Sequence, residues 1–357
     1  MKANHKYYSN LAFNLAENHL GKTSTNPSVG CVIVKNNTVI STGVTSITGR
    51  PHAEFNALNK KINFNGANMY VTLEPCTHYG LTPPCTDIIK YKKIKNVFYN
   101  YKDPDERTFG KAKKELLKNN IKLKRIKNIK KNFYKSYFIN KYKNLPLIDA
   151  KIAISNDYNT INKTCKRITN NRSRNVSHLL RSKYDCILST SKTINCDNAL
   201  LNCRIEGMDN LKPDLLVVDR NLKLKKNLKL LKLSKHRKTY IFTSSLNKKK
   251  INFFKNKKCK IIKINELKTK NDFQNFLKII YRLGKRRILV ESGLIFLNKL
   301  LNYKLVNDLF IFKTKKKLRK KGYNNTKSQY LKKYRLINSI KVNLNEDKLF
   351  KVKAFNV

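Results

Sequence analysis

The 357-residue sequence has no tryptophan, only 11 glycines and 8 prolines, and no run of eighteen apolar residues. The last absence excludes a membrane-spanning helix of the usual length, which needs about 20 apolar residues. Because 40% of the residues are hydrophobic, the composition is nevertheless not that of a disordered protein. The length favours two domains, each large enough to bury a core of its own.

We expect no secretory signal in the N-terminal segment either, because Asn, Glu, His and Lys interrupt its apolar positions. The eight cysteines are too scattered, in too long a chain, for a disulfide scaffold. We therefore expect a cytoplasmic protein whose cysteines are reduced and are mostly small buried hydrophobic residues. Cys76 and Cys85, on either side of an eight-residue loop, are the exceptions.

Acidic residues are scarce, since 22 Asp and Glu stand against 78 Lys and Arg, for a formal net charge of +56. Clustered basic residues would indicate nucleic-acid binding. Here, however, lysine supplies 63 of the 78 and is spread along the whole chain, together with many Asn, Ile, Tyr and Phe, which have A/T-rich codons. We interpret the charge as compositional drift and expect no nucleic-acid partner, although anionic small molecules would still be attracted.

The first 145 residues alternate between helical and strand patterns. Apolar spacing predicts a helix over 5–20, and β-branched segments at 29–35 and 37–42, joined at Asn36-Asn37, predict a hairpin. The patterns that follow predict helices over 52–60, 83–92 and 111–120, and strands over 68–74, 94–100 and 121–126. This alternation predicts a central sheet with helices on its faces.

A second α/β domain is expected over residues 146–357, after a boundary at Asn144-Leu145-Pro146. Its predicted strands cover 146–154, 185–190, 213–219, 238–243, 259–264, 286–291 and 308–314. Its predicted helices cover 171–183, 271–283 and 293–303, and the basic run at 316–321 is expected in a solvated loop. No GxGxxG sequence is present, which argues against a Rossmann-type cofactor site.

The segment EPCTHYGLTPPC, residues 74–85, holds a thiol at each end of its loop. Zinc takes Cys and His ligands tetrahedrally, so two cysteines supply half a site. The missing protein ligand should be a histidine on a neighbouring element, and His52 follows Pro51 at a predicted helix start. Three protein ligands leave the fourth position to water, which is typical of catalytic zinc.

Glu54 lies two residues after His52 on the same predicted first helical turn, where a carboxylate could carry the proton of that water. Singly, these residues have simpler explanations: a capping or core histidine, a first-turn acid favoured by the helix dipole, and a core cysteine. In this order, His-Ala-Glu followed by Pro-Cys and a later Cys is the general signature of zinc nucleobase deaminases.

Three segments closely resemble the first domain of the bifunctional riboflavin biosynthesis deaminase/reductase family: TNPSVGCVIVK (25–35), PHAEFNAL (51–58) and VTLEPCTHYGLTPPCTDIIK (71–90). Superfamily members that act on nucleosides or RNA commonly space their cysteines by two residues, whereas this family spaces them by eight. The resemblance implies a cytidine-deaminase-like α/β/α domain over residues 1–145. It also implies that His52, Cys76 and Cys85 bind zinc, that Glu54 moves the proton and that Asn26 helps to hold the pyrimidine.

More weakly, and to about residue 315, the second half resembles the family's NADPH-dependent reductase domain, which is similar in fold to dihydrofolate reductase. The segments 179–204, 215–224 and 288–301 carry this resemblance. The substrate contacts that it implies are Cys165, Arg181, Leu201, Arg204 and Glu291. The cofactor contacts that it implies are Ala153, Arg167, Thr193, Asp197, Arg220 and Gly293.

Physical chemistry supports part of this assignment. Two arginines can grip a ribose phosphate bidentately, and Gly293 opens a predicted helix whose free amide hydrogens suit a cofactor phosphate. The chain also departs from the family pattern. Asn156 and Tyr158 replace the leucine and the glycine of the family's Ser-Leu-Asp-Gly motif. Asn198 and Ala199 replace the second aspartate and the proline of an Asp-Asp-Pro turn. Arg167 stands in place of a tryptophan, and Cys165 in place of a serine.

The resemblance thus implies zinc-dependent deamination at carbon 2 of a phosphoribosylated diaminopyrimidinone, followed by hydride transfer from NADPH to the ribose carbon 1. Three alternatives stay open: a deaminase with a degenerate reductase domain, an RNA or nucleoside deaminase, and a non-catalytic protein with structural zinc. The expected partner is a small-molecule substrate rather than a membrane. The oligomeric state is left open, with a homo-oligomer as one alternative.

Overall fold

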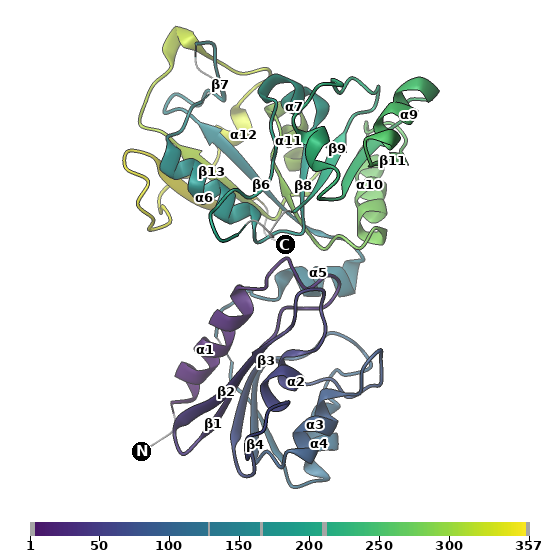
Figure 1. The fold of residues 1–357 in the computed structure, drawn as a ribbon. Helices are drawn as coiled ribbons and strands as arrows, with labels where there is room; N and C mark the ends of the chain where they lie inside the picture. Colours follow the sequence, from purple (N-terminus) through teal and green to yellow (C-terminus); the bar gives the residue numbers. More distant parts are fainter. Residues whose placement is uncertain (1–3, 128, 165–166, 209–212, 355–357) are drawn as a thin grey trace. The chain divides into compact units, whose positions relative to one another are not determined.

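The computed structural model describes residues 4–127, 129–164, 167–208 and 213–354, and the chain separates into two compact units, Met1–Leu145 and Pro146–Val357. Each unit is a β-sheet with α-helices on its faces (Figure 1). The α/β class expected from the alternating patterns is therefore confirmed for both halves.

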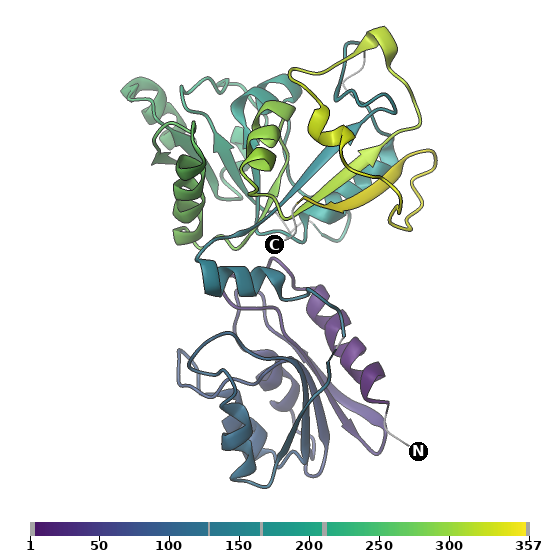
Figure 2. The same ribbon diagram turned by 180° about the vertical axis from the view of Figure 1, so that it is seen from behind.

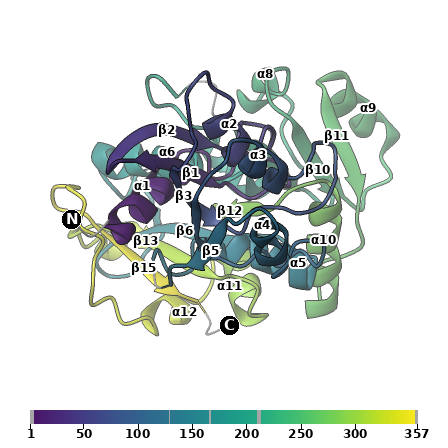
Figure 3. The ribbon, with the colours of Figure 1, turned by 90° about the horizontal axis from the view of Figure 1, so that it is seen from below.

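The first unit contains a five-stranded sheet in the order β2-β1-β3-β4-β5. Its strands are β1 (Gly30–Lys35), β2 (Thr38–Val44), β3 (Asn68–Leu73), β4 (Asn96–Tyr101) and β5 (Lys122–Arg125). Its helices are α1 (His5–Glu17), α2 (Ala53–Leu58), α3 (Cys85–Tyr91), α4 (Ala112–Leu117) and α5 (Lys135–Lys143). α1 lies on one side of these strands, and α2, α3 and α4 lie on the other (Figures 1 and 3).

The hairpin forms as predicted, with β1 and β2 antiparallel and both residues of its turn, Asn36 and Asn37, at positive φ. Asparagine tolerates this conformation better than most residues, and it matches the twist of a two-residue hairpin. β1 also pairs antiparallel with β3, whereas β3, β4 and β5 run parallel. The buried central strand β3 therefore points its carboxyl end toward the starts of the following helices.

Two glycines let helices approach this sheet closely. A Cβ at Gly43 of β2 would lie 2.2 Å from the Ala53 carbonyl oxygen, and one at Gly30 of β1 would lie 1.9 Å from the Ala12 carbonyl oxygen. Both distances are far below van der Waals contact, so any side chain there would push α2 or α1 off the strands. Gly43 thereby fixes the position of α2.

The second unit contains an eight-stranded sheet in the order β11-β10-β9-β8-β12-β6-β13-β15. Its strands are β6 (Leu147–Ile154), β8 (Cys186–Thr190), β9 (Asp214–Val218), β10 (Thr239–Thr243), β11 (Cys259–Lys263), β12 (Arg287–Val290), β13 (Asp308–Lys313) and β15 (Lys348–Lys353). All neighbouring pairs are parallel except β13 and β15. A small separate sheet pairs β7 (Ile161–Asn162) with β14 (Gly322–Tyr323).

Helices cover both faces of the large sheet. They are α6 (Asn171–Arg181), α7 (Ser191–Asp197), α8 (Leu230–Leu233), α9 (Lys248–Asn256), α10 (Lys270–Arg282), α11 (Leu294–Asn302) and α12 (Gln329–Lys332). Phe254 of α9 packs with Ile187 and Ile241 in one buried cluster. On the other face Phe276 of α10 contacts Phe242 edge-on, and Figure 2 shows α10 and α11 together on this side.

Several short elements were not predicted. The sequence pattern missed α5, α7, α8, α9, α12, β7, β14 and β15, and α1 ends three residues earlier than expected. The basic run at 316–321 is mostly exposed, as expected, but Arg319–Lys321 form a turn of 3₁₀-helix rather than an irregular loop. Within the described ranges, no helix combines the length and the apolar character needed to cross a membrane.

The described cysteines are all free thiols. Cys31, Cys186, Cys203 and Cys259 are buried, as expected for small hydrophobic residues, whereas Cys196 is exposed.

Candidate metal centre and a second polar cluster

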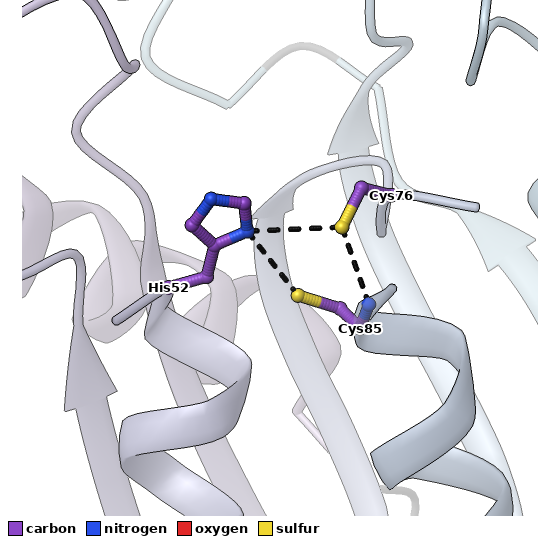
Figure 4. A group of neighbouring side chains, drawn as sticks. All are labelled: His52, Cys76 and Cys85. Atoms are coloured by element: carbon purple, nitrogen blue, oxygen red, sulfur yellow. Dashed lines mark hydrogen bonds between the residues drawn. The ribbon is translucent and has the colours of Figure 1, made fainter. Parts of the chain in front are cut away.

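Three separate elements of the first unit bring His52, Cys76 and Cys85 together (Figure 4). His52 is the residue that precedes the first turn of α2, Cys76 follows the end of β3, and Cys85 is the first residue of α3. β3 is a nearly continuous buried strand, so its end is fixed by the core, and Pro84 sets the start of α3.

The distances fit a tetrahedral zinc ion. His52 Nδ1 lies 3.4 Å from Cys85 Sγ and 3.7 Å from Cys76 Sγ, and all three ligand atoms lie within 4.8 Å of one another. Ligand bonds of about 2.0 Å to nitrogen and about 2.3 Å to sulfur at a tetrahedral angle give a nitrogen-to-sulfur separation of about 3.5 Å. Two soft sulfurs and one imidazole are also the donor set that zinc prefers.

The surroundings stabilise a thiolate at Cys76. The backbone N–H of Cys85 donates a hydrogen bond to Cys76 Sγ over 3.2 Å. Hydrogen bonding from the Cys85 thiol, with help from that backbone N–H and from His52, lowers the pKa of Cys76 to about 4 despite its partial burial. Thiolate is the form that binds metal, so this chemistry agrees with the geometry.

Glu54 lies in the first turn of α2 and is only 4% exposed. Burial, followed by the nearby Cys76 thiolate, raises its pKa from 4.5 to about 7, while His52 and a hydrogen bond from Cys85 act in the opposite direction. A buried carboxyl group that touches the ligand set without completing it matches the position expected for a proton carrier.

A second loop braces the segment that carries Cys76. The buried carboxylate of Glu74 accepts the backbone N–H groups of Asp103 and Gly110, at 3.3 and 3.2 Å. Thr77 donates to the Arg107 carbonyl, and His78 Nδ1 lies 3.1 Å from the Thr108 hydroxyl. The loop 103–110 therefore holds the cysteine segment from the side. Sequence reasoning did not identify this loop.

Asn26 lies in the turn between α1 and β1, where its side-chain nitrogen donates to the Gly49 carbonyl over 2.8 Å. Gly49 has φ +100°, and a Cβ there would lie 2.6 Å from the Thr23 carbonyl oxygen. Asn26 and Gly49 thus join the turn at residue 26 to the segment that leads into Pro51 and His52. The predicted contact of Asn26 with the pyrimidine stays a prediction.

In the second unit, Arg181, Glu291 and Lys151 form a buried cluster of ion pairs, and the first two were predicted from the sequence. Arg181 at the end of α6 makes two hydrogen bonds to Glu291, after β12, at 2.5 and 2.9 Å. The Nζ atom of Lys151 on β6, which sequence reasoning did not identify, lies 3.5 Å from Oε2 of that carboxylate. Burial opposes the charged form of Glu291, but Arg181 and then Lys151 outweigh it and lower its pKa to about 2.

Arg181 and Arg204 are linked through Asn202 and His178. The Asn202 carbonyl accepts from His178 Nδ1 and from Arg181 Nη1, each at 2.9 Å. Arg204 donates to the Asn202 side chain at 2.9 Å and lies 3.2 Å from His178 Nε2. Because the carbonyl only accepts and the guanidinium only donates, we assign the proton of His178 to Nδ1 and leave Nε2 as the acceptor.

Thr193 and Gly293, both expected near the cofactor, do lie together. The backbone N–H of Gly293, which precedes the first turn of α11, donates to the Thr193 hydroxyl over 3.1 Å. The Gly293 amide is therefore already engaged by Thr193. No side chain caps α11, so the amides of the following turn remain the ones suited to phosphate.

The other predicted residues are more dispersed. Leu201 is buried in the core at positive φ, Ala153 packs beside a cluster on β13, and the side chains of Arg167, Asp197 and Arg220 are exposed. Asp197 ends α7, and its charge acts on Lys151. The Arg220 carbonyl accepts the N–H groups of Ser244 and Ser245. Cys165 lies outside the described residues.

Lys151 and His178 had detectable signals in the sequence. Lys151 is a charged residue inside the apolar run LIDAKIAI, where burial would require a partner. His178 lies three residues before Arg181 and so shares its helix face.

His178 is expected to make folding dependent on pH. Burial and the charge of Arg181 lower its pKa to about 4, whereas an unfolded histidine titrates near 6.5. Between these values the unfolded chain binds the proton that the folded chain refuses, so stability should rise with pH across this window. When the pH falls from 7 to 5, we expect the free energy of unfolding of the His178→Gln variant to decrease by about 2 kcal/mol less than that of the wild type.

Urea unfolding at the two pH values, followed by circular dichroism, measures this difference. Identical pH dependence of the two proteins would contradict a neutral His178.

Comparison with known proteins identifies a family match for each of the two units. The family model described as the cytidine and deoxycytidylate deaminase zinc-binding region matches residues 2–101, and the model of the RibD C-terminal domain matches residues 146–314. The riboflavin biosynthesis protein RibD of Buchnera aphidicola subsp. Baizongia pistaciae is 31% identical over 322 residues, which cover 86% of each chain.

Two further proteins are similar to one or both units. The diaminohydroxyphosphoribosylamino-pyrimidine deaminase of Buchnera aphidicola subsp. Schizaphis graminum is 42% identical over 120 residues, 33% of this chain and 82% of that protein. The solved diaminohydroxyphosphoribosylaminopyrimidine deaminase/5-amino-6-(5-phosphoribosylamino)uracil reductase of Thermotoga maritima superposes with a TM-score of 0.81 at 23% identity, covering 98% of both chains. At that identity the superposition supports the fold.

Proposed function

Because this chain belongs to the RibD family and is a bifunctional riboflavin biosynthesis enzyme, we propose that it acts on a phosphoribosylated diaminopyrimidine. The first unit would remove the amino group at carbon 2 of 2,5-diamino-6-(5-phosphoribosylamino)pyrimidin-4(3H)-one by hydrolysis. The second unit would then reduce the ribosyl chain to give 5-amino-6-(5-phosphoribitylamino)uracil. The names of the Schizaphis and Thermotoga relatives support this choice of substrate.

One observation carries the deaminase assignment. Within the unit that matches a deaminase zinc-binding region, His52, Cys76 and Cys85 converge at distances that suit a single zinc ion, and buried Glu54 hydrogen-bonds to Cys85 without joining the ligand set. A structural zinc site would have four protein ligands, whereas a catalytic site has three and an open position. Among the described residues, the metal-ligating group has three members.

We assign the proton transfers to Glu54. When bound, a zinc ion at this centre supplies Lewis acidity that lowers the pKa of a water from about 15.7 to about 7. The Glu54 carboxylate accepts one proton of the attacking water and passes it to the ring nitrogen; it then takes the remaining hydroxyl proton of the adduct and passes it to the departing amino group as the C–N bond breaks. Water adds one oxygen to carbon 2, and the amino group leaves as ammonia.

The reductase assignment depends on the second polar cluster. NADPH, when bound, supplies the hydride, while the protein orients cofactor and sugar. The uncapped first turn of α11 offers amides to a cofactor phosphate, and Thr193 holds its start. Arg204 would bind the substrate phosphate, and Lys151, held by Glu291, would orient the sugar hydroxyls.

We also propose that the protein works in the cytoplasm, which the free thiols of the described residues support.

A coupled assay tests both activities and the metal at once. With the diaminopyrimidine substrate, we expect ammonia release that a zinc chelator abolishes and added zinc restores, because hydrolysis requires the metal. The deaminated intermediate, supplied directly, should still oxidise NADPH in the presence of the chelator.

Three other results would change the proposal. Deamination of an RNA stem-loop without activity on the pyrimidine would replace the substrate class. Ammonia release without NADPH oxidation by the intermediate would leave a deaminase with a degenerate reductase domain. Full activity in the chelator would remove the zinc mechanism.

A further inference from the structure

Arg50 immediately precedes Pro51 and lies two residues before His52, in the segment that delivers the first metal ligand. Its Nε atom is buried and has no hydrogen-bond partner. Across the described ranges, the Arg50 side chain takes part in none of the hydrogen bonds or ion pairs of the protein. A buried guanidinium nitrogen left unpaired costs free energy, because it has lost water without gaining another acceptor.

Two buried arginines in this chain show how the terminal nitrogens of a guanidinium can be held by the protein. Arg181 is held by the Glu291 carboxylate and the Asn202 carbonyl. Arg237, which has no carboxylate partner, donates from its two Nη atoms to three backbone carbonyls, although its Nε is as unpaired as that of Arg50. Both side chains are thus fixed by groups of the protein. Arg50 has no such set, which suggests that its acceptor comes from outside the chain.

The tip of Arg50 lies beside the loop that joins the two cysteine ligands. A Cβ built on Gly80, the fourth residue after Cys76, would be 3.7 Å from Arg50 Nη2. Gly80 is exposed, whereas Glu54 and Cys85 are buried. The charge of Arg50 also acts on His52 through space. The guanidinium therefore lies next to the metal group, at the exposed side of the centre.

We infer that Arg50 is a specificity-determining residue of the deaminase site that binds the phosphate of the substrate's phosphoribosyl group. This inference rests on the proposed deaminase function. A planar guanidinium presents paired N–H donors that match two phosphate oxygens, and it keeps its charge at any relevant pH. A substrate whose ring reaches buried Glu54 has its phosphoribosyl arm toward the exposed side, where Arg50 ends.

The first test compares Arg50→Gln with the wild type on the phosphorylated substrate and on the same riboside without phosphate. We expect kcat/KM for the phosphorylated substrate to fall about 10- to 100-fold, because hydrogen bonds to a charged group are lost. Turnover of the riboside should be unchanged, and zinc content should equal that of the wild type. Arg50→Lys should recover part of the loss, since it restores the charge but not the paired donors.

Arg125→Gln is the matched control, because Arg125 is an exposed arginine on the edge strand β5 of the same unit. It removes one positive charge from the same unit and should leave both substrates unaffected. An equal loss with phosphorylated and unphosphorylated substrate in Arg50→Gln would overturn the inference, since Arg50 would then act through His52 or the fold. No loss with either substrate would overturn it as well.

Gly80 provides a second, independent test. Gly80→Asp should add a carboxylate within reach of the Arg50 guanidinium and so compete with the substrate phosphate, raising KM for the phosphorylated substrate alone. Gly80→Ala is its control, because a Cβ at 3.7 Å is an ordinary contact. In the double variant Arg50→Gln, Gly80→Asp the aspartate should add little to the effect of Arg50→Gln; fully additive effects would contradict a shared site.

Failure of the deaminase function itself gives a different result. A wild-type protein that releases no ammonia from either substrate refutes the proposed function. A wild-type protein with the same kcat/KM for the phosphorylated and the unphosphorylated substrate refutes only the role of Arg50.

Discussion

Replacement of Glu54 by glutamine is expected to lower kcat for deamination by about 10²- to 10⁴-fold. Glutamine keeps the size of the side chain and can still hydrogen-bond near Cys85, but it cannot accept the proton of the attacking water. The metal ligands His52, Cys76 and Cys85 are untouched, so the zinc content should remain that of the wild type. Ammonia release and metal analysis on the same preparation measure the two quantities.

Three controls make this result specific. Glu115→Gln alters a partly exposed carboxylate of α4 that pairs with Lys118 and should leave deamination unchanged. Cys85→Ser should lose zinc together with activity, which Glu54→Gln should not. NADPH oxidation with the deaminated intermediate should be the same in all three variants, because that reaction belongs to the second unit. Wild-type ammonia release by Glu54→Gln would instead favour a structural zinc site.

The metal centre could be predicted from the sequence because its information is local. Each ligand lies beside a residue that fixes a chain direction: Pro51 before His52, the apolar strand before Cys76, and Pro84 before Cys85. Zinc chemistry then restricts which of the nearby side chains can meet. The hairpin at Asn36-Asn37 was predictable for the same reason, since its turn chemistry lies within two residues.

The second polar cluster was only partly predictable because its partners are far apart in sequence. Arg181 and Glu291 are separated by 110 positions, and Lys151 comes from a third element. No local pattern shows that a β6 lysine and an α6 arginine share one carboxylate. Resemblance suggested two of the three residues as substrate contacts, but the structure shows that they first neutralise each other. That pairing follows from parallel strand order, which only the folded chain reveals.

Lysine-rich composition hid several elements. Helix α9 has the sequence KKKINFFKN, and strand β15 has the sequence KLFKVK. Lysine fills most of the exposed positions in both, so the polar residues do not help to tell a helix from a strand. The apolar residues of α9 are only Ile251, Phe253 and Phe254, of which Phe254 alone is fully buried, and so short a pattern cannot distinguish helix from loop. Elements whose stability comes from packing on the sheet are therefore the ones that a reading of local sequence misses.

Replacement of Glu291 by glutamine is the change expected to damage the second unit most. Glu291 is the carboxylate shared by Arg181 and Lys151, and the side chains of all three are less than one-fifth exposed. Removing the negative charge leaves two buried cations without a counter-charge, which costs about 3–5 kcal/mol when a buried ion pair is broken in this way. Exposed Glu266, paired with Lys268, is the matched control, because Glu266→Gln should change stability by less than about 0.5 kcal/mol.

Urea unfolding measures the stability loss, and ammonia release shows that the first unit remains active in each variant. Lys151→Met separates the fold from the chemistry, because it keeps the bidentate pair between Arg181 and Glu291 and removes a cation whose own pKa burial lowers. We expect this variant to stay folded and to lose NADPH oxidation with the deaminated intermediate. Normal oxidation by Lys151→Met would leave Lys151 with a purely structural role, since the buried lysine would then serve only to balance the charge of Glu291.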